Sequence, residues 1–302
     1  MNDRNDRTPE NRTRVAVANL PVDEGAVDAN LARALDAVER ATATGARLLV
    51  LPECALTGYR YDSRAEVEAA ALALDDAPVV ELAERAEGRE LTVVVGLLER
   101  AGTSLYNSAA VLGADGRVTV VRKVHLPHLG ADRFVAAGDA IGPVIDTACG
   151  RVGVAICYDF RFPETCRTLA LGGAEIVAVP VNWSTRVAVL AEHVVPTRAL
   201  ENRVFVAVAD RVGGAPGAEH LGASRVADPD GAVVAAPQDR SVASVTAATV
   251  DRARARDKST VFVPGEFEID AFVDRRPQLY GALTAATPMT ATPRRPDQED
   301  EP

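Results

Sequence analysis

Cysteine is scarce in this chain of 302 residues, which has four: Cys54, Cys149, Cys157 and Cys166. Their spacing includes no Cys-x-x-Cys pair and no regular framework of the kind that cross-links small secreted domains or holds structural zinc. The sequence also lacks any apolar run of the roughly 18–20 residues that span a bilayer. Residues 1–12 are polar and lack the apolar core of a signal peptide. We therefore expect reduced thiols, a cytoplasmic location and no membrane partner.

Positive charge and histidine are also scarce. The formal net charge is −10 and the sequence pI is about 5.0, which argues against nucleic acid or an anionic membrane as a partner. The chain has four histidines, and His125 and His128 could bind a metal ion only with help from carboxylates. The glycine-rich segment 213–217 lacks phosphate-loop spacing and a following lysine. The sequence predicts no metal site and no cofactor.

The feature that stands out against this background is a cysteine at the end of an apolar strand. Residues 152–156 are mostly β-branched or small, Cys157 follows them, and Pro163 opens a predicted helix. A sharp turn between strand and helix would present the thiol outward on a rigid backbone, as a nucleophile requires. A free cysteine can equally be a small buried hydrophobic residue. The pattern alone leaves both interpretations of Cys157 open.

Two charged residues occupy similar positions. Lys123 follows the predicted strand 117–122 and is one of two lysines in the chain, the other being Lys258. A lysine ammonium is a compact point charge, whereas an arginine guanidinium is broad and planar. Lys123 could equally be an ordinary solvated lysine at the end of a strand. Glu53 follows the apolar segment 48–52, where it caps a turn or faces a cleft. In open α/β sheets, sites form at the carboxyl ends of strands, so these groups could meet.

Strands and helices alternate along the chain, which is typical of an α/β fold. We expect one domain over residues 13–285 and disordered tails over residues 1–12 and 286–302. Strands are predicted in ten segments: 14–20, 47–51, 91–98, 106–112, 117–122, 152–156, 175–181, 204–209 and near Val233 and Val245. Helices are predicted at 27–44, 78–86, 163–171 and 187–201, the last interrupted by Pro196. A proline inside a helix costs ~3 kcal/mol, so we expect a kink or a helix start there.

Several motifs occur together in one chain order. They are Leu51-Pro52-Glu53, Leu56-Thr57-Gly58-Tyr59, Arg122-Lys123-Val124-His125-Leu126-Pro127, Cys157-Tyr158-Asp159-Phe160-Arg161-Phe162-Pro163-Glu164, Pro180-Val181-Asn182-Trp183, Arg198-Ala199-Leu200-Glu201-Asn202-Arg203, Asp228-Pro229-Asp230-Gly231 and Arg275-Arg276-Pro277. With this set, the chain from about residue 14 to residue 282 resembles the nitrilase (carbon–nitrogen hydrolase) superfamily. The motif Tyr-Asp-x-Arg-Phe-Pro-Glu after the cysteine resembles its amidase branches, whereas true nitrilases usually have Trp-Glu there.

The resemblance implies an α/β fold of four layers, an α-β-β-α sandwich, and a homodimer or higher homo-oligomer. It also implies a catalytic triad of Glu53, Lys123 and Cys157. Glu53 would take the thiol proton, Cys157 would attack an amide carbonyl, and Lys123 with the backbone N–H of Tyr158 would stabilise the oxyanion. The implied reaction is cofactor-independent hydrolysis of a small linear carboxamide to a carboxylic acid and ammonia through a thioester.

The chain departs from the family pattern at a second glutamate that many amidases carry after the lysine motif. Ala131 occupies that place, and the shorter Asp132 beside it could substitute, but the direction of its side chain cannot be derived from the sequence. We therefore leave Asp132 out of the predicted triad.

Four residues near these motifs are candidates for binding substrate: Tyr59, Tyr158, Asn182 and Trp183. The aromatic members could equally pack in the core. Two alternative functions stay open. One is an N-carbamoyl amino-acid amidohydrolase, and the other is a catalytically silent, nitrilase-like interaction protein.

Overall fold

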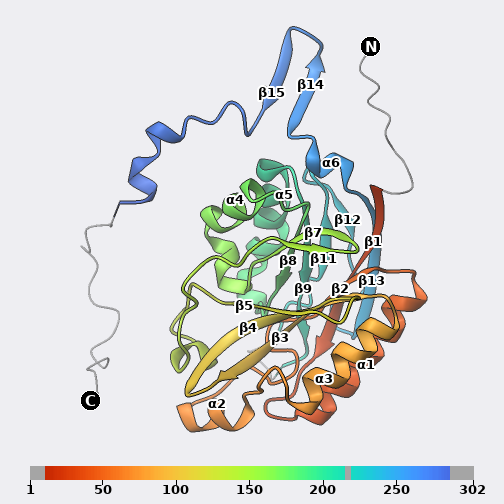
Figure 1. Ribbon diagram of the computed structural model, residues 1–302, viewed down its shortest axis with the longest axis vertical. Helices are drawn as coiled ribbons and strands as arrows, with labels where there is room; N and C mark the ends of the chain where they lie inside the picture. The colour runs from red at the N-terminus through yellow and green to blue at the C-terminus, as the bar shows by residue number, and fades with distance from the viewer. Residues whose placement is uncertain (1–10, 215–218, 286–302) are drawn as a thin grey trace. The chain divides into compact units, whose positions relative to one another are not determined.

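The computed structural model describes residues 11–214 and 219–285, which fall into two compact units divided between Lys258 and Ser259. The predicted tail 286–302 and residues 1–10 of the predicted N-terminal tail lie outside the described residues. Asn11 and Arg12 are described, and Arg12 begins the first strand. Figure 1 traces the chain and labels its elements.

The first unit contains two β-sheets, of which one has seven strands in the order β10-β1-β2-β3-β4-β5, with β13 also paired to β1. Its strands are β1 (Arg12–Pro21), β2 (Leu48–Val50), β3 (Thr92–Ala101), β4 (Ser104–Leu112), β5 (Val118–Arg122), β10 (Arg211–Val212) and β13 (Ser244–Asp251). The strands β1, β2 and β3 run parallel, whereas β4 is antiparallel to both β3 and β5. The carboxyl ends of β2 and β5 therefore lie at one edge of this sheet.

The other sheet has six strands in the order β12-β11-β9-β8-β7-β6. They are β6 (Ile145–Thr147), β7 (Gly150–Val154), β8 (Ile176–Pro180), β9 (Phe205–Ala209), β11 (Arg225–Ala227) and β12 (Val233–Ala235). Its central strands β7, β8 and β9 are parallel. Because parallel strands of this kind are covered on both faces, they are apolar along their whole length, and every residue of β8 and β9 is buried.

Alternate residues of the strands build two different cores. Val15 and Val17 of β1 belong to a buried cluster with Val152 and Val154 of β7, so this face packs one sheet against the other. Ala16 lies between these two valines and points to the opposite face of the sheet. It belongs to a separate cluster that includes residues of helices. The two-residue period of a strand thus separates sheet-facing from helix-facing positions.

Helices cover the outer faces of both sheets, which completes the four predicted layers. Helices α1 (Val27–Ala43) and α3 (Ala77–Gly88) pack on the first sheet, and α4 (Pro163–Leu171) and α5 (Val195–Asn202) pack on the second. Two shorter helices are α2 (Arg64–Ala70) and α6 (Ala253–Arg256). Figure 1 shows α1 and α3 on the opposite side of the strands from α4 and α5. The α-β-β-α sandwich is confirmed. No helix in the described part of the chain has the length and apolar character needed to cross a membrane.

Pro196 begins a helix, which is one of the two outcomes expected for it. The segment Leu190–Val194 forms a π-helical turn, and α5 then starts at Val195 with the proline in its first turn. A proline has no backbone N–H, and the first turn of a helix has no partner for that group anyway.

The second unit contains an antiparallel hairpin of β14 (Ser259–Val263) and β15 (Phe267–Asp270). Two short 3₁₀ turns follow, at Pro277–Leu279 and Gly281–Leu283.

Candidate active site

Glu53 lies in a tight turn beyond the carboxyl end of β2, with its side chain buried. This turn is held against Gly96 of β3, whose N–H donates to the Pro52 carbonyl at 3.2 Å and whose carbonyl accepts from Leu56. A Cβ added at Gly96 would lie 2.4 Å from the Cys54 nitrogen and 2.6 Å from the Glu53 Cα. Only glycine lets the two backbones approach this closely, so β3 fixes the position of the Glu53 backbone.

Lys123 is a buried cation held between two carboxylates. It follows β5 directly, and its backbone N–H donates to the Asn107 carbonyl of β4 at 2.8 Å. The Nζ atom lies 2.7 Å from Glu53 Oε1 and 2.6 Å from Asp132 Oδ2, and all three side chains are inaccessible to solvent. Burial alone would lower the pKa of Lys123, but the charges of Glu53 and Asp132 outweigh it and raise that pKa well above its usual range. The ammonium is therefore the stable form.

Asp132 is the residue that the sequence analysis left outside the triad, and the structure places its carboxylate in the cluster. It lies in the 3₁₀ turn Gly130–Arg133, while the neighbouring Ala131 is buried in an apolar cluster. Burial raises the pKa of Asp132, Lys123 lowers it, and the charge of Glu53 raises it further. The shorter side chain reaches Lys123 from the neighbouring position.

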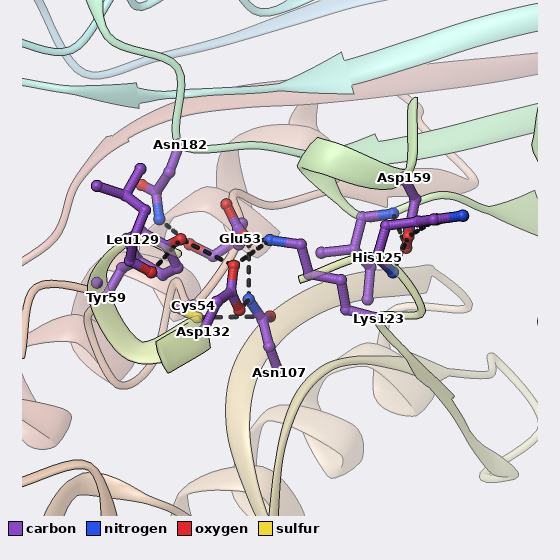
Figure 2. Close-up of polar contacts among 12 residues, drawn as sticks. Glu53, Cys54, Tyr59, Asn107, Lys123, His125, Leu129, Asp132, Asp159 and Asn182 are labelled. Carbon is purple, nitrogen blue, oxygen red and sulfur yellow. Dashed lines mark hydrogen bonds and ion pairs between the residues drawn. The ribbon is translucent and has the colours of Figure 1, made fainter. Parts of the chain in front are cut away.

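Asn107 of β4 joins the two carboxylates and was not singled out from the sequence. Its Nδ2 donates to Glu53 Oε1 at 2.9 Å and to Asp132 Oδ1 at 2.8 Å, and its Oδ1 accepts from the Cys54 thiol at 3.6 Å. Figure 2 shows Glu53, Asp132, Lys123 and Asn107 converging in this way. An asparagine within a mostly apolar strand was the available signal, because such a side chain needs partners when it is buried.

Cys157 lies beyond the carboxyl end of β7 and begins the 3₁₀ turn Cys157–Arg161. Its φ of +45° is in the left-handed region, where a non-glycine residue is strained. Burial and the Glu53 charge raise the pKa of the thiol well above its usual range, while Lys123 and a hydrogen bond from the Asn182 backbone lower it less strongly. The thiol is therefore protonated at rest and lies within hydrogen-bonding reach of the Glu53 carboxylate. All four cysteines are free, and Cys157 alone among them is partly exposed.

Asp159 ties the turn that carries Cys157 to the segment that follows Lys123. Its Oδ1 accepts from the His125 backbone N–H at 2.8 Å and lies 2.7 Å from His125 Nδ1. The His125 ring also stacks on Phe162 with centroids 3.8 Å apart. The contact between Asp159 and His125, drawn in Figure 2, connects the carboxyl ends of β5 and β7. The described residues hold no group of three or more His, Cys, Asp or Glu side chains placed to share a metal ion.

Two of the four candidate substrate-binding residues line a cavity of about 620 Å³ beside the cluster. The Tyr59 hydroxyl donates to Asp132 Oδ2 at 2.8 Å or to the Leu129 carbonyl at 2.9 Å. The Asn182 side-chain amide donates to the Glu53 carbonyl at 3.2 Å. Two residues that line the cavity thus contact Asp132 and Glu53 directly.

The other two candidates make different contacts. Tyr158 is partly exposed and packs edge-on against Phe162 with centroids 5.2 Å apart. Trp183 is buried, contacts Phe160 through its ring, and donates its backbone N–H to Asp210 at 3.0 Å. Their role in binding substrate stays a prediction.

Comparison with known proteins agrees with this geometry. A family model described as carbon–nitrogen hydrolase matches residues 14–259. A protein named nitrilase from Pyrococcus abyssi is 36% identical over 254 residues, which cover 84% of this chain and 93% of the relative. A protein named (R)-stereoselective amidase from a Pseudomonas species is 31% identical, covering 90% of this chain and 94% of the relative.

A solved structure has the same fold. The amidase from Nesterenkonia sp. superimposes with a TM-score of 0.74 at 24% sequence identity, covering 90% of this chain and 96% of that one. With Glu53, Lys123 and Cys157 meeting at the strand ends and a family match over nearly all of the first unit, the chain belongs to the carbon–nitrogen hydrolase family of the nitrilase superfamily.

Proposed function

We propose that this carbon–nitrogen hydrolase cleaves small linear carboxamides to a carboxylic acid and ammonia, through a thioester on Cys157. The observation that carries the proposal is the ion-paired cluster of Glu53 and Lys123, both buried, next to Cys157, a partly exposed residue with a strained backbone. A buried charge cluster of this kind is costly to maintain and is typical of an active site. An interaction protein without catalytic activity would have no use for such a costly cluster, so its presence argues against that alternative.

Acylation begins with a protonated thiol. Because the pKa of Cys157 is raised by burial and by Glu53, a general base must remove the proton as the sulfur attacks the carbonyl carbon. Glu53 is that base, and the new C–S bond pushes the carbonyl electrons onto oxygen. The Lys123 ammonium and the Tyr158 backbone N–H stabilise this oxyanion. When the intermediate collapses, the C–N bond breaks, Glu53 returns the proton to nitrogen, and ammonia leaves.

Deacylation repeats the sequence with water. Glu53 takes a proton from a water molecule as its oxygen attacks the thioester, and Lys123 again stabilises the oxyanion. The C–S bond then breaks, the carboxylic acid leaves and the sulfur recovers its proton from Glu53. Asp132 and Asn107 touch neither bond, and they act by holding Lys123 and Glu53 in place.

The test is ammonia and carbon dioxide release from a panel of ω-amides, short aliphatic amides, nitriles and N-carbamoyl amino acids. We expect ammonia without carbon dioxide, and its loss in Cys157→Ala. Carbon dioxide appearing with ammonia would assign the chain to carbamoyl hydrolysis instead, and turnover of nitriles would assign it to the nitrilase branch. Substantial amidase activity in Cys157→Ala would contradict the mechanism.

A second pair of variants tests the role of the ammonium. Lys123→Ala should lose nearly all turnover, and Lys123→Arg should not restore it, because the planar guanidinium cannot replace a point charge in a fully buried position between two carboxylates. Recovery of activity in Lys123→Arg would show that any cation suffices there.

A further inference from the structure

The cavity beside the catalytic cluster is lined by segments that lie far apart in the sequence. Residues 59–62 form one part of the wall, residues 128–130 and 133 another, and Asn182, Ser184, Arg186 and His220 a third. The third wall is held together by the backbone, since Ser184 and His220 form a β-bridge and Thr185 donates to the Glu219 carbonyl. The cavity lies in the first unit and is built by the scaffold that holds Glu53.

The charged side chains of this wall are mostly basic. Three arginines line the cavity, Arg60, Arg133 and Arg186, with one acidic side chain, Asp62. Arg133 already pairs with Asp62 at 3.2 Å. This local surplus of positive charge contrasts with the net charge of −10 of the whole chain.

Arg186 differs from the other two arginines of this wall in having no partner in the described part of the chain. It is exposed on the 3₁₀ turn Thr185–Val187. Within the described residues its guanidinium makes no hydrogen bond or ion pair, unlike that of Arg133. A planar guanidinium of this kind can donate two parallel hydrogen bonds to a carboxylate.

His220 adds a second group that is poorly partnered by the described residues. Both of its ring nitrogens are buried and neither makes a well-formed hydrogen bond within that part of the chain, although the Trp183 backbone lies close enough to raise the pKa against the larger lowering effects. Burial and the charges of Arg211 and Arg60 lower the pKa of His220 to about 4. The ring is therefore neutral near pH 7, with one N–H to donate. A buried polar group without a partner is costly, and a ligand oxygen in the cavity would satisfy it.

We propose that this cavity binds a carboxylate at the end of the substrate remote from the scissile amide, with Arg186 as its ion-pair partner and His220 as a hydrogen-bond donor. This rests on the proposed function, and it narrows the substrates to amides that also carry a free carboxylate. Monoamides of short dicarboxylic acids and N-carbamoyl amino acids share this chemistry.

Selectivity between matched substrates tests the proposal. Glutaramate and pentanamide have equal chain length, and so do succinamate and butanamide, but only the first of each pair is an anion. Since hydrogen bonds to charged groups contribute the equivalent of about tenfold or more, we expect kcat/KM to favour the anion by at least that factor. Arg186→Gln should lower this ratio about tenfold, mainly through KM for the anion, and Arg186→Lys should retain part of it.

The matched control is Arg40→Gln, which removes an exposed arginine of α1 outside the cavity and should leave the ratio unchanged. Equal turnover of both members of a pair by the native enzyme, or the same ratio in Arg186→Gln, would overturn the proposal while leaving amide hydrolysis intact. N-carbamoyl-β-alanine in the same assay distinguishes the two sources of the carboxylate, because it alone releases carbon dioxide.

A binding measurement separates this inference from the proposed function. Glutarate should bind to the Cys157→Ala protein in calorimetry, and Arg186→Gln in that background should weaken binding about tenfold. If no amide in the panel were hydrolysed but glutarate bound in this way, the anion site would stand and the proposed reaction would fail. If amides were hydrolysed but glutarate binding did not depend on Arg186, the anion site would be wrong.

Discussion

The Nζ atom of Lys123 lies 2.6 Å from Oδ2 of Asp132, and neither side chain is accessible to solvent. Asp132 thereby supplies the second carboxylate on the lysine, although the place where many amidases carry a glutamate holds Ala131. The ammonium is shared between this aspartate and Glu53. Removing one partner of a buried ion pair commonly costs about 3–5 kcal/mol, since the remaining charge stays buried.

Asp132→Asn should lower kcat/KM by about 10²–10³, because Lys123 loses a charge that fixes its position. The charge of Asp132 helps to hold the pKa of Lys123 well above its usual range, so the basic limb due to Lys123 should lie above the assayed range in the native protein and move to lower pH in the variant. Steady-state kinetics between pH 6 and 10 measure both effects. Asp36→Asn, at an exposed position on α1, is the control. An unchanged basic limb in Asp132→Asn would remove Asp132 from the positioning of Lys123.

Gly96→Ala should damage the site from the neighbouring strand. The added methyl group would meet backbone atoms of Cys54 and Glu53 at 2.4–2.6 Å, and such overpacking costs about 1–3 kcal/mol. We expect a lower free energy of unfolding in urea and a loss of kcat, because the Glu53 turn must move.

Gly88→Ala is the matched control for this substitution. Gly88 ends α3, and a Cβ there would have no neighbour within 4 Å, so stability should be unchanged or rise by about 0.4–1 kcal/mol. If Gly96→Ala behaved like Gly88→Ala, the close approach of β3 would not be what positions Glu53.

Thiol labelling should single out Cys157. The native protein should incorporate one equivalent of iodoacetamide, slowly because the raised pKa keeps the Cys157 thiol protonated, and the Cys157→Ala protein should incorporate none, because Cys54, Cys149 and Cys166 are buried. Burial also raises the pKa of Cys166 to about 12. The denatured protein should incorporate four equivalents. Mass spectrometry of the labelled peptides reads the sites, and rapid labelling of another cysteine would contradict the exposure that the structure assigns.

The stability of the protein should depend on pH through His220. Its pKa is lowered from 6.5 to about 4 by burial and by the charges of Arg211 and Arg60. Between these values the unfolded chain binds a proton that the folded protein does not, so stability is present above pH 6.5 and declines toward pH 4.

Urea unfolding at pH 7.0 and pH 4.5 measures this contribution. Because solvent screens a partly exposed ring, we expect the decline in His220→Asn to be smaller than in the native protein by about 1 kcal/mol. The control is His193→Asn at an exposed position. An identical decline in the native protein and in His220→Asn would show that His220 titrates alike in both states.

The local pattern of the sequence was enough to predict most of the strands and three residues at strand ends, whereas the four layers and the catalytic roles were implied by the resemblance to a family. Residues 15–17 and 152–154 contain no polar side chain, so the sequence predicts buried strands there, and the structure shows which face each residue occupies. Glu53, Lys123 and Cys157 each follow an apolar strand, and parallel strands bring their carboxyl ends to one edge. Both inferences need only neighbours along the chain.

The tertiary structure decided which other side chains reach that edge. Asn107 and Glu53 are 54 positions apart in the sequence. Their contact depends on the register in which β4 pairs with β3, and the pattern of apolar residues within one strand does not determine that register. The inward direction of Asp132 depends on a 3₁₀ turn that buries Ala131 against Tyr59 and Cys54. The excess of arginine around the cavity likewise arises where separate loops meet. These features follow from long-range packing, so the sequence could suggest Glu53, Lys123 and Cys157 but not the further polar side chains that surround them.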